Sequence, residues 1–102
     1  MITPALINAA KINAQQAWGE PHVFDCYDRT EPCVWARTFV AWTLRSNGAT
    51  LQQTGNAISR HHASVLNLLD KMRFALDHPG MFADVMRKYD YYTKSLEYDL
   101  HH

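Results

Sequence analysis

The residues best suited to chemistry lie in a polar run near the middle of the chain. Four hydrogen-bonding side chains and one methyl group follow one another there, namely Arg60, His61, His62, Ser64 and Ala63. An arginine can donate to O6 and N7 of guanine, histidine and serine can hydrogen bond to base edges or phosphates, and an alanine methyl can contact a thymine methyl. These residue types favour recognition of a nucleic acid over bond-making chemistry.

Catalytic and metal-binding patterns are weak. No serine or paired carboxylate stands in a recognisable catalytic arrangement, although Cys26 or Cys33 with His22 could form a thiol–base pair. The same three residues are candidate zinc ligands, but their spacing fits none of the patterns of structural zinc sites. No glycine-rich phosphate loop with its lysine occurs. We therefore expect no enzymatic activity, metal or other cofactor, and we interpret both cysteines as free thiols, one of them buried.

The polar run lies at the junction of two expected helices. Thr50 and Gln53 form a capping-box pattern, in which each side chain satisfies a backbone amide of the first turn, and this predicts a short helix over 51–58. Ser59 can cap a second helix immediately, which we expect over 60–77. The two helices and their short turn predict a helix-turn-helix.

The second of these helices has a strong apolar face, formed by Val65, Leu66, Leu69, Met72 and Leu76. The His-Pro-Gly sequence at 78–80 ends it, because proline cannot continue a helix. Since apolar residues begin only at Val65, the polar run should project beyond the core. In a helix-turn-helix the N-terminal residues of the second helix meet base edges in the major groove. We therefore expect the unit over 50–77 to bind double-stranded DNA.

Three further helices complete an all-α prediction. Apolar residues at helical spacing predict helices over 4–18, 31–46 and 81–98. A Thr-Pro sequence marks the start of the first and a Thr-Glu-Pro sequence the start of the second. The segment 19–29 should be a connecting loop from which Val23 and Phe24 dock on the core. A chain of 102 residues is expected to form one domain, 1–102, with five helices.

The aromatic residues are expected to serve mainly the core. Trp18, Trp35 and Trp42 are predicted to bury apolar area on helix faces, with Trp35 or Trp42 as a candidate for exposure. Tyrosines crowd the C-terminal helix and cannot share one helical face, so some rings must be exposed or shared with a second copy. Two further partners are therefore compatible with the sequence, a second copy of the chain in a homodimer or another protein.

The net charge is zero, but basic residues gather in the centre. Residues 32–75 hold five basic residues and one acidic residue, whereas each end of the chain carries a net charge of −2. Phosphate neutralisation provides most non-specific DNA affinity, so four basic residues are candidates for contacts with the DNA backbone, namely Arg37, Arg45, Lys71 and Arg73. The competing interpretation is a helical protein-interaction module that does not bind DNA.

The central segment resembles a known family. The sequence TLQQTGNAISRHHASV at 50–65 resembles the hallmark S-L-x-x-I-G-x-x-F-G-G-R-D-H-[ST]-T-V of the C-terminal DNA-binding domain of the bacterial replication initiator DnaA, a Trp-repressor-like helical domain. Five positions are identical, namely Leu51, Gly55, Arg60, His62 and Val65. The resemblance covers roughly residues 30–98. It implies a stand-alone DNA reader in replication or transcription control, for example in a phage or mobile element.

The resemblance implies DNA contacts at Arg60, His62, Ala63 and Ser64, with His61 standing where the family has aspartate. Ser59 alone replaces two glycines of the hallmark, so the turn is one residue shorter. The basic loop that enters the minor groove in the family has no clear counterpart.

The sequence also predicts a cytoplasmic location. No apolar run approaches the roughly 18 residues needed to cross a bilayer, and the N-terminus lacks the layout of a secretory signal. We therefore expect no association with a membrane.

Overall fold

The described part of the protein folds into five helices. The computed structural model describes residues 2–19, 21–24 and 30–101, and within these ranges there is no β-strand. The helices are α1 (Pro4–Trp18), α2 (Glu31–Ser46), α3 (Leu51–Ile58), α4 (His62–Asp77) and α5 (Ala83–His101). The predicted all-α class is confirmed, and the first three helices have the predicted bounds.

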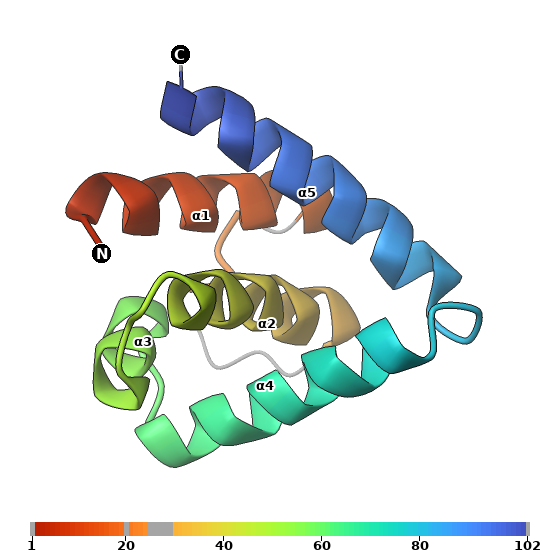
Figure 1. The fold of residues 1–102 in the computed structure, drawn as a ribbon, viewed down its shortest axis with the longest axis horizontal. Coiled ribbons are helices and arrows are strands. Elements are labelled where there is room, and N and C mark those ends of the chain that lie inside the picture. The colour runs from red at the N-terminus through yellow and green to blue at the C-terminus, as the bar shows by residue number, and fades with distance from the viewer. Residues whose placement is uncertain (1, 20, 25–29, 102) are drawn as a thin grey trace.

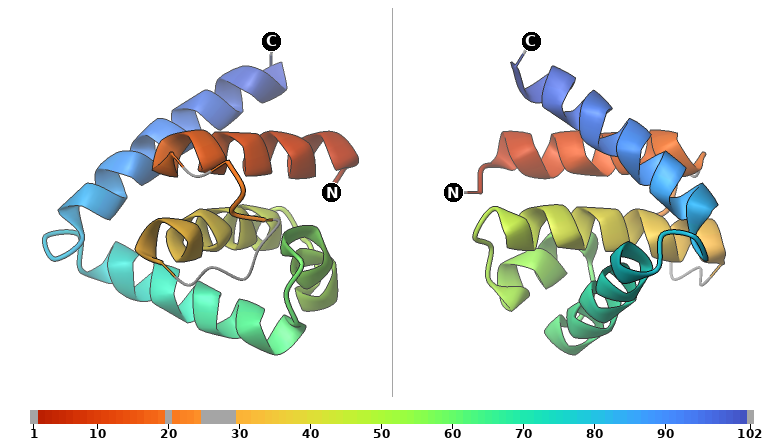
Figure 2. Two further views of the ribbon diagram at one scale, coloured as in Figure 1. Left: turned by 180° about the vertical axis from the view of Figure 1, so that it is seen from behind. Right: turned by 45° about the vertical axis from the view of Figure 1, so that its right-hand side comes forward.

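Helix α2 forms the centre of the fold. It lies between α1 and α4, α3 lies across its C-terminal end, and α5 runs back over α1 (Figures 1 and 2). More than half of its 16 residues are buried, on all sides of the helix. A helix that is surrounded in this way must be apolar around most of its circumference. The run Cys33–Leu44 meets this requirement, apart from Arg37, Thr38 and Thr43.

An aromatic core joins α1, α2 and α5. It consists of Trp18, Trp35, Phe39, Tyr89 and Tyr92. The rings of Trp18 and Trp35 stack with centroids 6.4 Å apart, and the Phe39 ring lies 5.2 Å from that of Tyr92. The tryptophans therefore serve the core, as predicted: Trp35 is 2% exposed and Trp42 packs against the core.

Tyr92 is the polar centre of this core. Its hydroxyl lies 2.7 Å from the hydroxyl of Thr43, which donates in turn to the carbonyl of Phe39. Burial raises the pKa of Tyr92 well above its ordinary value, although the Thr43 hydrogen bond opposes this shift. Two other tyrosines of α5, Tyr91 and Tyr98, are exposed, so the predicted division of the rings is confirmed.

Residues 23 and 24, which precede α2 in the chain, are anchored by their apolar side chains. Val23 and Phe24 are 0% and 5% exposed and belong to the core, as predicted. Lys11 on α1 lies over the Phe24 ring, 5.0 Å from its centroid. Residues 21–24 are therefore part of the packed structure and provide backbone groups that other helices can contact.

Two predicted features of α4 are wrong. The helix begins at His62 instead of residue 60, because Ser59 has a left-handed conformation that ends α3 and cannot start the next helix. Leu66 and Leu76 were expected in the core but are 48% and 37% exposed. The buried stripe is Val65, Leu69, Met72 and Ala75, and each exposed leucine directly follows a residue of this stripe.

Helix α5 also differs from the prediction, since it spans 83–101 instead of 81–98.

Candidate nucleic-acid interface

Helices α3 and α4 form a unit with a turn of three residues, 59–61. The predicted capping box starts α3: the Thr50 hydroxyl accepts from the Gln53 amide at 3.0 Å, and the Gln53 side chain accepts from the Thr50 amide at 2.9 Å. At the other end of α3 the amide of Arg60 donates to the carbonyl of Gly55 at 2.8 Å. The turn is therefore folded tightly against the end of α3.

Two backbone conditions make this tight turn possible. A Cβ atom at Gly55 would lie 2.5 Å from the carbonyl oxygen of Arg60, so only glycine fits without a shift of the backbone. Ser59 has φ +58°, and among the described residues it is the only non-glycine residue with positive φ. This region is sterically unfavourable for residues with a Cβ atom. Gly55 and Ser59 thus fix the direction in which α4 leaves the turn.

His61 caps α4, a role that the sequence pattern assigned to Ser59. Its Nδ1 accepts a hydrogen bond from the amide of Ala63 at 3.1 Å. An accepting Nδ1 carries no proton, so the neutral ring has its proton on Nε2. The His62 ring lies beside it, with centroids 4.1 Å apart. The imidazole of His61 is therefore held in place by the helix that it caps.

Residues 60–64, which we call the tip, gather the side chains that the sequence singled out. His61, His62, Ala63 and Ser64 are exposed, and Arg60 is partly exposed. The first core residue of α4 is Val65, which is fully buried. The tip is thus polar and accessible, whereas the next turn of α4 anchors it.

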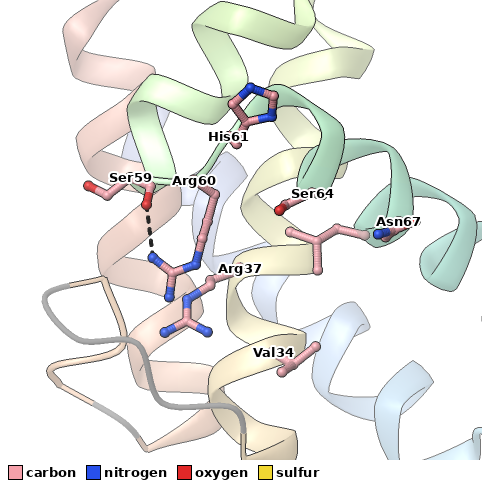
Figure 3. A pocket seen from close by; sticks show the side chains of 8 residues that line it. Val34, Arg37, Ser59, Arg60, His61, Ser64 and Asn67 are labelled. Carbon is pink, nitrogen blue, oxygen red and sulfur yellow. Dashed lines mark hydrogen bonds between the residues drawn. The ribbon is translucent and has the colours of Figure 1, made fainter.

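A hollow of about 560 Å³ lies beside the tip, between α4 and α2. It is lined by Val34, Arg37, Ser59, Arg60, His61, Ser64, Asn67 and Leu68. Figure 3 shows the guanidinium groups of Arg37 and Arg60 directed toward the same side of this hollow. Arg60 donates to the carbonyl of Ser59 at 2.9 Å, an exposed hydrogen bond.

Arg37 is part of the scaffold. It is 4% exposed, and its Nε and Nη2 both donate to the carbonyl of Val23, at 3.1 and 2.8 Å. These bonds connect α2 to the segment before it and satisfy a carbonyl that would otherwise be costly to bury. The sequence suggested a DNA-backbone contact at this position. In the structure Arg37 lines the hollow without projecting from the surface.

Arg45 and Lys71 are not brought to the tip. Arg45 lies at the α2–α3 connection, at the far end of α3, where it donates to the carbonyl of Ala49. Lys71 lies about 13 Å along α4 from His62, given a rise of about 1.5 Å per residue. Its ammonium group is 3.9 Å from a carboxylate oxygen of Glu31 and 4.7 Å from the centroid of the Trp35 ring. Both cations therefore have neighbours away from the predicted reading surface.

Three amide side chains near the tip were missed. Gln52 and Asn56 line a second hollow of about 300 Å³ with Arg60, His61 and His62, on the α3 side of the turn. Asn67 lines the first hollow, one turn after Ser64. The signal was present in the sequence, since residues 52 and 56 are spaced by about one helical turn. Their relation to the tip, however, depends on the direction of the turn.

The structure describes only part of the alternative thiol and zinc sites. Cys33 is buried at 2% exposure and packs in the core, while Cys26 lies outside the described residues. In the described part of the chain, no three His, Cys, Asp or Glu side chains come close enough together to hold a metal ion. The buried state of one cysteine agrees with the prediction.

Comparison with known proteins gives no further guide to function. Neither protein-family models, nor curated proteins, nor solved structures give a significant match to this chain. None of the helices, over the residues described, combines the length and the apolar character that a membrane span requires.

Proposed function

We propose that the protein binds double-stranded DNA through the α3–turn–α4 unit, with the tip in the major groove. The observation that carries this proposal is the separation of roles within α4. Its first three residues, His62, Ala63 and Ser64, are exposed and include two polar side chains, and the buried stripe begins only at Val65. This is the arrangement by which a helix-turn-helix presents the start of its second helix to base edges.

Arg60 is the proposed guanine-reading residue. A guanidinium can donate two hydrogen bonds to O6 and N7 of guanine, and Arg60 lines a hollow together with His61 and His62. Reaching a base requires Arg60 to turn away from the Ser59 carbonyl, to which it is held by an exposed hydrogen bond. His61, His62 and Ser64 would meet bases or adjacent phosphates, and Ala63 a thymine methyl.

The charge distribution supports DNA binding of modest strength. Arg73 lies 3.5 Å from Asp70 and Lys71 lies 3.9 Å from Glu31, so part of the central positive charge is balanced locally. Few phosphates would then be neutralised, and the affinity should fall with salt by a shallow slope. The resemblance to the DnaA domain leads us to propose a role in replication or transcription control.

A protein-interaction module is the second candidate function. Leu66, Phe74 and Met81 are 48%, 48% and 71% exposed on α4 and on the turn that follows it. Exposed apolar side chains of this size favour contact with another protein when they form one patch. An apolar interface would depend little on salt, unlike contacts with phosphates.

The test is a fluorescence-anisotropy titration of a labelled duplex of random sequence, repeated across a salt series. A second duplex carries the origin box that the DnaA family reads. We expect log-linear weakening with salt, and a loss of about 1–3 kcal/mol of specific binding in Arg60→Ala. Arg87→Ala is the matched control, because Arg87 is exposed on α5 and pairs with Asp84. Absence of binding at low salt would reject the proposal in favour of the interaction module.

A further inference from the structure

The hollow on the α3 side of the turn combines side chains from both helices of the unit. Gln52 and Asn56 come from α3, Arg60 and His61 from the turn, and His62 from the start of α4. Both hollows share Arg60 and His61, so the tip forms a ridge between them. A ligand that receives the tip would therefore also meet the exposed amides of α3.

The two amides of α3 have no structural task among the described residues. The neighbouring Gln53 serves the capping box, whereas the Gln52 side chain makes no hydrogen bond within the described part of the chain. The Asn56 side chain also makes no hydrogen bond among the described residues, although its backbone carbonyl accepts from the amide of Ser59 at 3.4 Å. Both side chains are exposed. Their removal should therefore leave the fold intact.

We propose that Gln52 and Asn56 are specificity-determining residues that read adenine beside a guanine read by Arg60. This inference rests on the proposed DNA-binding function. A carboxamide carries one acceptor and two donors, which match the N6 donor and the N7 acceptor of adenine. A phosphate offers acceptors only, so the carbonyl oxygen of the carboxamide would remain unused. The first helix of the unit thus shares in base reading with the start of the second.

The amides give base discrimination without charge. A neutral side chain releases no counterion from DNA, so its loss leaves the salt dependence of binding unchanged. The loss of a good bidentate pair reduces discrimination against a wrong base by about 5- to 150-fold. Base preference therefore reports on the two amides of α3, whereas the salt dependence of binding reports on the basic residues.

The experiment selects binding sites from a pool of duplexes with a randomised core. It uses the wild type, Gln52→Ala/Asn56→Ala, and the control Asn8→Ala/Gln16→Ala, whose residues lie on α1, away from the tip. We expect the wild type and the control to enrich adenine next to guanine. The α3 variant should keep its affinity for random duplex within about twofold, keep its salt slope, and lose the adenine preference by at least about fivefold.

A conservative exchange sharpens the test. Asn56→Asp replaces a donor–acceptor pair by acceptors, which suit the N4 donor of cytosine, so the selected base should change from adenine to cytosine. A purely structural role would not change base identity. If the α3 variants select the same sites as the wild type, the inference fails while DNA binding stands. If the wild type binds no duplex, the proposed function itself fails.

Discussion

The aromatic core and the tip reach a defined geometry by different means. In the core, Trp35 and Tyr92 are fixed by packing on all sides, at 2% and 0% exposure. In the tip, the side chains are exposed, and their position depends on backbone conditions at Gly55 and Ser59 and on the His61 cap. Substitutions in the core should therefore change stability alone. Substitutions of the exposed tip side chains other than the His61 cap should change binding alone.

The largest effect is expected for Trp35→Ala. The indole is surrounded by Trp18, Phe39 and Phe82 and donates to the Glu31 carboxylate at 2.8 Å. We expect a loss of about 3–5 kcal/mol in the free energy of unfolding, measured by urea titration. Tyr91→Ala, at an exposed ring of α5, is the control and should change it by less than about 0.5 kcal/mol. Equal losses in both variants would contradict the core assignment.

Gly55→Ala tests whether the comparison holds for the backbone of the turn. The added methyl meets the Arg60 carbonyl at 2.5 Å, so either the turn shifts or strain remains. We expect a loss of about 1–3 kcal/mol and, because the tip is displaced, weaker DNA binding as well. Gly80→Ala is the matched control, since a methyl group added there would meet nothing within 4 Å. A stable Gly55→Ala variant with unchanged binding would show that the tight turn is unnecessary.

Tyr92→Phe tests the hydrogen-bonded hydroxyl pair of the core. Removing the Tyr92 hydroxyl should lower the free energy of unfolding by about 0.5–1.5 kcal/mol at neutral pH. Because burial raises the pKa of Tyr92 above 10.0, its contribution is complete below that pH and declines as the pH rises above it. The wild type should therefore lose stability above pH 10 more steeply than Tyr92→Phe. Tyr91→Phe should follow the wild type, and identical slopes in all three would contradict the assignment.

The smallest effect is expected for Ser59→Gly. Glycine adopts φ +58° without the steric penalty of a Cβ atom, so stability should rise by up to about 1 kcal/mol. Ser95→Gly, inside α5, should instead lower stability by roughly 0.5 kcal/mol. Differential scanning calorimetry distinguishes the two directions. A lower melting temperature in Ser59→Gly would show that its side chain has a role that the turn geometry does not reveal.

Local sequence signals predicted much of the fold. The Thr3 and Thr50 caps and the prolines near two helix starts depend on neighbouring residues only, so the bounds of the first three helices could be read directly. The start of α4 could not, because Ser59 can either cap a helix or adopt positive φ. The close approach of Arg60 to Gly55 decides between these options.

Side-chain placement was less predictable where long-range partners decide it. From the sequence, Arg37 was expected to be a surface cation. In the structure it donates to the Val23 carbonyl, a partner 14 residues away that only the fold brings close. Gln52 and Asn56 are not among the positions at which the resemblance to the DnaA domain implies DNA contacts. Their place beside the tip depends on the angle between α3 and α4, which the sequence does not reveal.

The His61 cap also determines whether the His61 ring can donate or accept a hydrogen bond at the tip. With Nδ1 occupied by the Ala63 amide, the ring can offer only its Nε2–H to a ligand. It can therefore serve acceptors such as phosphate oxygens, guanine N7 or thymine O4, and it offers nothing to the amino groups of adenine and cytosine. The side chain that caps α4 therefore also limits which hydrogen-bonding atoms of the DNA groove it can bind.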